Sequence, residues 1–200
     1  MLFRSVQGRS SDRLVFVHRL GADAAELQRR AGQIALGRPH GALIGPMTLR
    51  LGLIGRGHWG RNIERTLRSF DDVAVIPIGR NEQRPSSLDG VLIATPSDTH
   101  AELALPYIAD GIPTFIEKPM ATSVLDAERI REIALRSGAL VTVGHIHLHN
   151  PAFRALLATL PSIGPVQSLD FETMNFLPRT DGSILWDWLP HHLSEIGRAH

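Results

Sequence analysis

The stretch "LRLGLIGRGHWGRN", residues 49–62, decides the fold of this chain. An apolar run over 49–54 leads into Gly55, Gly57 and Gly60, which have the spacing G-x-G-x-x-G. After a strand and before a helix, the first glycine permits a tight turn, the second lets a pyrophosphate approach the backbone, and the third allows close helix packing. The unpaired N–H groups at the helix start would face the phosphates. The stretch predicts a dinucleotide-binding unit, with ordinary turn glycines as the alternative.

The following residues alternate between strand and helix patterns. Apolar runs predict strands at 73–79, 90–95, 114–119 and 139–144, and helical spacing predicts helices after residue 58, over 99–110 and over 123–138. Ser123 and Asp126 resemble a capping box, and Val124, Ala127 and Ile130 are expected to face inward. This order predicts a mostly parallel sheet in an open, doubly wound α/β fold of the Rossmann type.

The composition excludes several classes of function. The chain has 200 residues, a formal net charge of +1 and no cysteine, which excludes disulfides, thiolate catalysis and cysteine-bound metals. Its 21 basic residues form no block interleaved with aromatic residues, so no nucleic-acid partner is expected. No stretch approaches the roughly 20 apolar residues of a membrane span, and the start lacks a signal-peptide pattern. We therefore expect a cytoplasmic protein without a membrane partner.

The chain divides into three parts. Residues 1–46 are a doubtful N-terminal extension, 47–145 carry the dinucleotide-binding domain, and 146–200 are expected to begin a second α/β domain. The end segments 1–5 and 196–200 read as translated sequencing-adapter DNA. We therefore expect a truncated chain that is poorly stable and inactive by itself, because its second domain would leave apolar surface uncovered.

Four further stretches complete a known pattern. In chain order they are "ATPSDTH" (94–100), "EKP" (117–119), "GHIHLHNPAF" (144–153) and "LWDWLPHHLS" (185–194). With the glycine motif they make residues 47–195 resemble the Gfo/Idh/MocA oxidoreductases, the family of glucose–fructose oxidoreductase and inositol dehydrogenase. The resemblance implies an NAD- or NADP-binding Rossmann domain, a second domain for substrate and subunit contacts, and a homo-oligomer at full length. It also implies hydride transfer between the cofactor and a secondary hydroxyl of a sugar or sugar nucleotide.

The same resemblance assigns the site residues. Cofactor-binding residues are Gly55, Gly57, His58, Trp59, Gly60, Arg80, Thr95, Pro96, His100, Glu117, Lys118 and Pro119; substrate residues are Lys118, His145, Asn150 and His191; catalytic residues are Lys118, Asp187 and His191. Thr95, Pro96 and His100 are expected along the nicotinamide. Asp187 and His191 match the family's Asp-x-x-x-His, and this spacing places both on one helical face.

The catalytic trio suits the oxidation of an alcohol. Histidine, with an ordinary pKa near 6.5, can take a hydroxyl proton near neutral pH, so His191 is the expected base. Lys118 would stabilise the developing alkoxide, and Asp187 would orient its partners and keep the cation paired. Taken singly, a solvated lysine, a surface histidine and a helix N-cap are the alternatives.

The sequence leaves the choice between NAD and NADP open. A ribose-binding acid is expected about twenty residues after the glycine motif. The second strand instead ends in Gly79, Arg80 and Asn81, with no acid before Glu82. Arg80 suits the 2′-phosphate of NADP, and equally suits stacking on the adenine of NAD.

Two features depart from the family pattern, and three histidines form a candidate metal site. His192 stands where members of this subgroup usually have an acid, and the segment 80–89 is too short for a helix and a strand, so the third Rossmann strand is expected to be missing. His145, His147 and His149 would share one face of an extended segment and could bind a transition metal. We expect instead that only His145 matches a family position and that His147 and His149 line the sugar pocket or face solvent, with no metal bound.

Two other functions stay open. One is a protein that binds a dinucleotide without catalysis, and the other is a family member that reduces an imine or a carbonyl. The presence of Lys118, Asp187 and His191 together favours an enzyme.

Overall fold

The computed structural model describes residues 48–79, 82–164 and 184–199, with residues 166, 168, 170 and 172 between the last two ranges. The proposed N-terminal extension and Arg80 lie outside the described residues. No described helix is long and apolar enough to cross a membrane.

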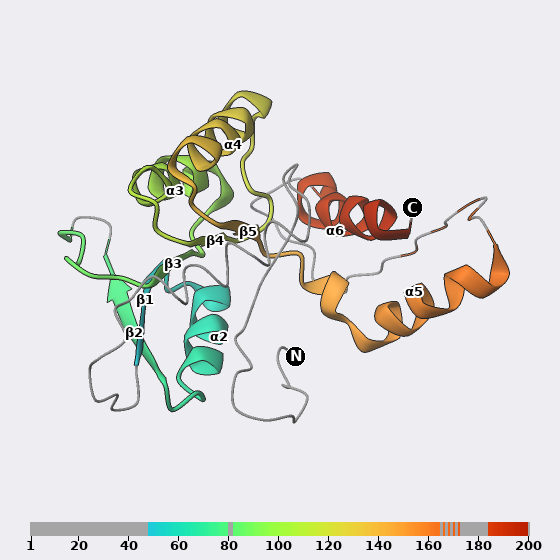
Figure 1. The fold of residues 1–200 in the computed structure, drawn as a ribbon, viewed down its shortest axis with the longest axis horizontal. Helices are drawn as coiled ribbons and strands as arrows, with labels where there is room; N and C mark the ends of the chain where they lie inside the picture. The colour runs from blue at the N-terminus through green and yellow to red at the C-terminus, as the bar shows by residue number, and fades with distance from the viewer. Residues whose placement is uncertain are drawn as a thin grey trace.

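Five strands and five longer helices are described, with two short 3₁₀ helices labelled η. In chain order the elements are β1 (Leu49–Ile54), α2 (His58–Leu67), β2 (Val73–Ile78), β3 (Gly90–Ile93), η1 (Ser97–Thr99), α3 (His100–Ala109), β4 (Thr114–Ile116), α4 (Val124–Ser137), β5 (Val141–Val143), η2 (Ile146–His149), α5 (Pro151–Ile163) and α6 (Ile184–Ala199). Figure 1 shows α2 on one side of the strands and α3 and α4 on the other.

The strands form one parallel sheet in the order β2-β1-β3-β4-β5. This confirms the predicted α/β fold of the Rossmann type. The described residues 82–89, between β2 and β3, contain no helix or strand, and among the described strands β2 pairs with β1 alone. From β1 the chain first adds β2 on one side and then returns to add β3 on the other side. The order of strand addition therefore reverses between β1 and β3, and open parallel α/β sheets bind their ligands at such a point.

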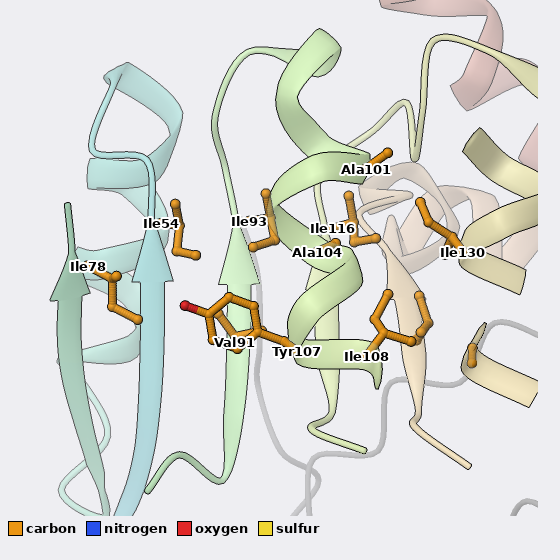
Figure 2. Close-up of a cluster of buried hydrophobic side chains, with 12 residues drawn as sticks. Ile54, Ile78, Val91, Ile93, Ala101, Ala104, Tyr107, Ile108, Ile116 and Ile130 are labelled. Carbon is orange, nitrogen blue, oxygen red and sulfur yellow. The ribbon is translucent and has the colours of Figure 1, made fainter. Parts of the chain in front are cut away.

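The main hydrophobic core lies between the sheet and the helices α3 and α4 (Figure 2). Successive strand side chains point to opposite faces, so Val91 and Ile93 enter this core from β3. Ile108 of α3 and Ile130 of α4 are fully buried in the same cluster. This packing fixes the strand ends on which the loops of the site stand.

The third predicted helix begins at the capping box. The Ser123 hydroxyl accepts a hydrogen bond from the Asp126 N–H at 3.1 Å and donates one to its Oδ2 at 2.7 Å. The helix ends at Gly138, which has a φ of +72°. The inward placement of Val124 is wrong, because this side chain is 76% exposed and the buried face of α4 begins later, at Ile130.

The opposite face of the sheet is covered in part by α2. A groove of about 430 Å³ remains between this helix and the sheet. Its apolar lining includes Leu51, Trp59, Ile63, Phe70, Leu92, Phe115 and Ile146. Trp59 thus lies at the junction of the groove and the loop that precedes α2.

Candidate active site

The carboxyl ends of β1, β3, β4 and β5 place four loops side by side. Backbone hydrogen bonds join each loop to the end of a neighbouring strand: Ala94 N–H to Ile54 O (2.8 Å), Glu117 N–H to Ile93 O (2.9 Å) and Gly144 N–H to Ile116 O (2.8 Å). These loops carry most of the residues that the sequence assigned to the site, so the fold brings them to one edge.

The glycine loop fits a dinucleotide pyrophosphate. Gly55 has a φ of +94°, and a Cβ there would overlap the Ala94 carbonyl oxygen. A Cβ on Gly60 would overlap the Gly55 carbonyl oxygen, so this glycine lets α2 pack against the loop. A Cβ on Gly57 would meet no described atom within 4 Å. The backbone at Gly57 therefore faces open space beside the N-terminus of α2, the place where an anion is stabilised.

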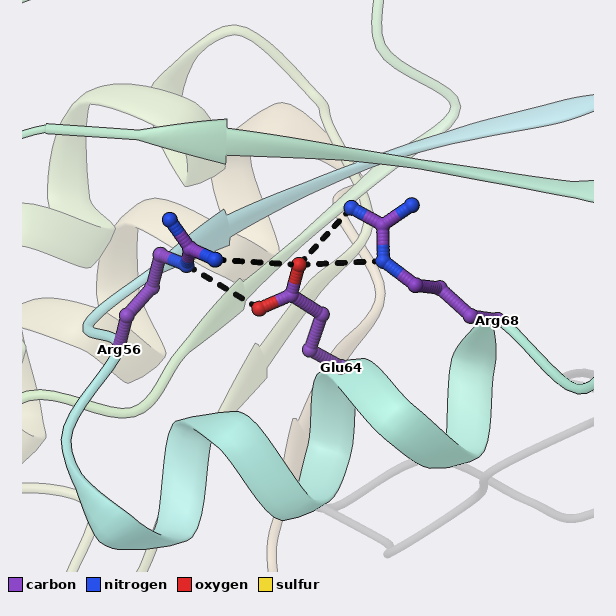
Figure 3. Close-up of polar contacts among 3 residues, drawn as sticks. All are labelled: Arg56, Glu64 and Arg68. Carbon is purple, nitrogen blue, oxygen red and sulfur yellow. Dashed lines mark hydrogen bonds and ion pairs between the residues drawn. The ribbon is translucent and has the colours of Figure 1, made fainter.

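Two arginines and one glutamate brace this loop from outside (Figure 3). Arg56, between the first two glycines, donates from Nε to Glu64 at 3.1 Å, and Arg68 donates to the same carboxylate at 2.8 Å. Hydrogen bonds from Arg68 and Arg56 hold the pKa of Glu64 below its ordinary value, against its desolvation. The sequence analysis missed this triad, although the spacing of four between Glu64 and Arg68 signals a helical ion pair.

The loop after β2 brings an acidic side chain to the end of that strand. Glu82 Oε2 accepts a hydrogen bond from the Gly79 N–H at 2.9 Å, so the carboxylate folds back to the end of β2. An acid therefore lies at the end of β2, although Glu82 comes later in the sequence than the pattern requires. At the other side of the cradle, His58 is exposed at the start of α2.

His100 joins two loops of the site. Its Nδ1 lies 2.8 Å from the Pro119 carbonyl oxygen and its Nε2 lies 2.9 Å from that of Thr95, and the side chain is 1% exposed. The Thr95 hydroxyl accepts a hydrogen bond from Thr99 at 2.8 Å. Both nitrogens of His100 thus face protein carbonyls, and Pro96 lies in the loop that this ring holds.

Lys118 and Asp187 meet across a long stretch of chain. Lys118 Nζ lies 2.5 Å from Asp187 Oδ1 and 2.9 Å from the Asp187 carbonyl oxygen. The side chains are 17% and 24% exposed, respectively. Helix α6 is thereby held beside the loop that follows β4, with the lysine cation paired and still reachable.

His191 lies one turn further along α6 and is 5% exposed. Its ring stacks on that of His147 from η2, with centroids 4.0 Å apart and planes 11° apart. Its Nδ1 has no hydrogen-bond partner among the described residues.

The pKa of His191 differs from the ordinary value that the sequence analysis assumed. Burial, reinforced by His147, Lys118 and His145, lowers the pKa of His191 to about 3, while Asp187 acts in the opposite direction. Its imidazole is therefore neutral at pH 7, ready to accept a proton but weakly basic.

The alternating histidines do not form the extended face that the sequence allowed. Residues 146–149 form the 3₁₀ helix η2, which directs His147 to α6, where its Nδ1 also lies 3.3 Å from Glu195 Oε1. His145 precedes η2, and burial lowers the pKa of His149. No group of three potential ligands suited to a metal ion occurs among the residues that the structure describes.

Two other assigned or neighbouring residues have defined places. Asn150 is exposed and caps α5, since its Oδ1 accepts a hydrogen bond from the Ala152 N–H at 2.9 Å. The side chain that the sequence assigned to substrate is therefore engaged by the helix start. His192 Nδ1 lies 3.3 Å from Glu195 Oε2, so an acid one turn later pairs with the histidine that replaces the usual acid.

Comparison with known proteins gives a consistent result. Residues 66–145 match the Gfo/Idh/MocA oxidoreductase family with its NAD-binding Rossmann fold. The inositol 2-dehydrogenases of Acidiphilium cryptum and Cereibacter sphaeroides (strain ATCC 17023) are 31% and 32% identical, covering 57% and 60% of this chain. A protein of Magnetospirillum magnetotacticum MS-1, described as an oxidoreductase, has a crystal structure that superposes with a TM-score of 0.64 at 33% identity. That match covers 74% of this chain and 56% of the other.

The matched relatives are longer than this chain. It spans 42% and 43% of the length of the two inositol 2-dehydrogenases. The resemblance stated from the sequence motifs is confirmed, and the relatives act on small molecules as their names state.

Proposed function

We propose that the protein that carries this chain oxidises a secondary hydroxyl of a sugar or sugar nucleotide, because residues 66–145 match the NAD-binding Rossmann fold of the Gfo/Idh/MocA oxidoreductases. The observation that carries the proposal is the Lys118–Asp187 pair, which lies at the same sheet edge as the open backbone of Gly57. A dinucleotide laid on the glycine loop would extend along this edge toward the lysine. When bound, its nicotinamide supplies the hydride acceptor.

The residues of the trio take separate roles. Lys118 holds a positive charge where the substrate oxygen becomes negative, which stabilises the alkoxide. Asp187 fixes the direction of the ammonium group through its carboxylate and its carbonyl oxygen. His191 is neutral and accepts the hydroxyl proton, and the nearby lysine offsets its weak basicity by acidifying that hydroxyl.

The cofactor-binding residues follow from the same edge. Gly55, Gly57 and Gly60 form the pyrophosphate cradle, and the N–H groups of His58 and Trp59 are among those at the helix start that lack intrahelical partners. The loops containing Thr95, Pro96 and Pro119 would lie along the nicotinamide, held in register by His100. This set of residues fits NAD or NADP.

Glu82 favours NAD over NADP. Its exposed carboxylate at the end of β2 can accept a hydrogen bond from a ribose hydroxyl and would repel a 2′-phosphate. The test is to titrate both dinucleotides into the wild type and Glu82→Gln. We expect the substitution to shift the affinity ratio toward NADP by about tenfold, and an unchanged ratio would remove Glu82 from the ribose site.

The substrate class is proposed from the relatives, which are named as inositol 2-dehydrogenases. The experiment is to follow nicotinamide absorbance while offering cyclic polyols, sugars and sugar nucleotides to the protein that carries this chain. Oxidation of one of these supports the proposal. Turnover only in the direction of carbonyl or imine reduction, or cofactor binding without any turnover, would replace it with one of the two alternative functions.

A further inference from the structure

A hydrogen bond joins the glycine loop to the loop that carries Lys118. Trp59 is the second residue of α2, directly beyond the glycine turn, and its indole Nε1 donates to Glu117 Oε1 at 2.7 Å. Glu117 is the residue before Lys118 and follows β4. One side chain of the phosphate-binding turn is thus bonded to the immediate neighbour of the lysine.

The surroundings of Glu117 leave its carboxylate few other arrangements. The side chain is 8% exposed, and its Oε2 accepts the Lys118 N–H at 3.2 Å. A Cβ on Gly144 would lie 2.8 Å from Oε1 and 2.9 Å from Oε2, so the missing side chain there leaves the space that the carboxylate fills. The carboxylate is therefore held between α2, its own loop and the end of β5.

Burial makes the charged form of this carboxylate depend on its donors. Desolvation raises the pKa of Glu117, and the hydrogen bonds from Trp59 and from the Lys118 backbone, together with the Lys118 charge, oppose that rise. A buried carboxylate that loses one donor either takes up a proton or turns toward another donor. Either change alters the acceptor of the Lys118 N–H.

We propose that Trp59 and Glu117 are positioning residues, and that their hydrogen bond holds Lys118 in register with the dinucleotide cradle. Since the backbone N–H of Trp59 lies at the helix start that faces the phosphates, the same residue contributes to the cradle and to the lysine loop. The sequence analysis assigned both residues to direct cofactor contact. This role rests on the proposed oxidoreductase function, in which Lys118 acts on the substrate oxygen.

The decisive variant is Trp59→Phe, which keeps a ring against the groove and removes the N–H donor. A carboxyl NMR titration should show a higher pKa of Glu117 in the variant than in the wild type, and the Lys118 Nζ resonance should shift. With the substrate that the wild type oxidises, kcat should fall about tenfold, the scale of one hydrogen bond to a charged group. The Kd of the dinucleotide should change less than about threefold, because the glycine cradle is intact.

Glu117→Gln provides a second test, since the amide oxygen can still accept the indole N–H but carries no charge. Adding Trp59→Phe to Glu117→Gln should cost less than Trp59→Phe alone costs, because the bond that is then removed ends on a neutral amide and is weaker than the bond to the charged carboxylate. Trp186→Phe is the matched control: Trp186 is 55% exposed on α6, and this substitution should leave kcat and the pKa of Glu117 unchanged.

The outcomes separate this inference from the proposed function. The NMR titration needs no substrate, so it tests the link even if the protein oxidises no sugar. An unchanged pKa of Glu117 and an unchanged Lys118 resonance in Trp59→Phe would overturn the inference. So would a loss of dinucleotide affinity as large as the loss of kcat, because the Trp59 side chain would then contact the cofactor directly.

Discussion

The two halves of the site are built by different means. In the cofactor half, Gly55, Gly57 and Gly60 are close in sequence. Gly55 packs against the loop at Ala94, and Gly60 packs against Gly55. In the catalytic half, Lys118 and Asp187 are 69 residues apart and meet through one ion pair. The first half depends on the shape of a short segment, whereas the second depends on the packing of α6 against the sheet edge.

The largest effect is expected from a substitution that disrupts the cofactor half alone. Gly57→Val should abolish dinucleotide binding in a fluorescence titration, because its side chain would occupy the space that the pyrophosphate needs. The thermal midpoint should stay near that of the wild type, since no described atom lies within 4 Å of the added Cβ. Gly60→Ala is the contrasting variant: it should also lower the midpoint, because its Cβ would overlap the Gly55 carbonyl oxygen. Unchanged dinucleotide affinity in Gly57→Val would refute the cradle.

The next largest effect is expected from a substitution that disrupts the catalytic half and leaves the glycine cradle intact. Lys118→Met should lower kcat by roughly a hundredfold, the scale of one lost donor at a developing oxyanion. Dinucleotide affinity should change by less than about tenfold, as the phosphate contacts remain. The control is Lys118→Met combined with Asp187→Asn, which should lose less than the product of the single losses. Strongly weakened cofactor binding with normal turnover would instead make Lys118 a phosphate or ribose contact.

A smaller effect is expected on the pH dependence of the free energy of unfolding, and it tests the burial of His191 in the catalytic half. The pKa of His191 is lowered to about 3 in the folded protein, whereas an unfolded histidine titrates near 6.5. Between these values the unfolded chain binds the additional proton, so the free energy of unfolding should fall as the pH drops from 6.5 toward 3. His191→Phe should make that fall shallower in urea titrations at several pH values. An NMR titration of His191 with a midpoint near 6.5 would contradict the burial of its ring.

The smallest effect is expected on the free energy of unfolding, from a substitution that lies away from both halves of the site. Ser123→Ala removes the cap of α4 and should cost about 1 kcal/mol of unfolding free energy. Dinucleotide affinity and kcat should not change, because α4 packs on the core and contributes no residue to the site. An altered kcat would show that the core helix affects the site directly.

The cofactor half could be predicted from the sequence because its determinants are local. The spacing of Gly55, Gly57 and Gly60 and the apolar strands suffice to place the turn and the parallel sheet. Pairing of Lys118 with Asp187 could be expected only through the family resemblance, since no local pattern links residues so far apart.

Other features depend on three-dimensional packing and escaped the sequence. The alternation of His145, His147 and His149 suggested an extended segment, but the chain forms the 3₁₀ helix η2 there, and His147 stacks on His191. The resulting lowered pKa comes from desolvation, which depends on neighbours and not on residue type. Glu82 shows the same limit, because only the folded loop brings its carboxylate to the end of β2.

The triad of Arg56, Glu64 and Arg68 has a consequence for the kinetics of binding. Two cations around one carboxylate leave one net positive charge at the entrance of the glycine loop, and both arginine side chains are more than half exposed. An anionic dinucleotide approaching from solvent is attracted by this charge before it touches the cradle. The association rate should therefore fall as salt shortens the reach of the field, while the dissociation rate reports the cradle contacts.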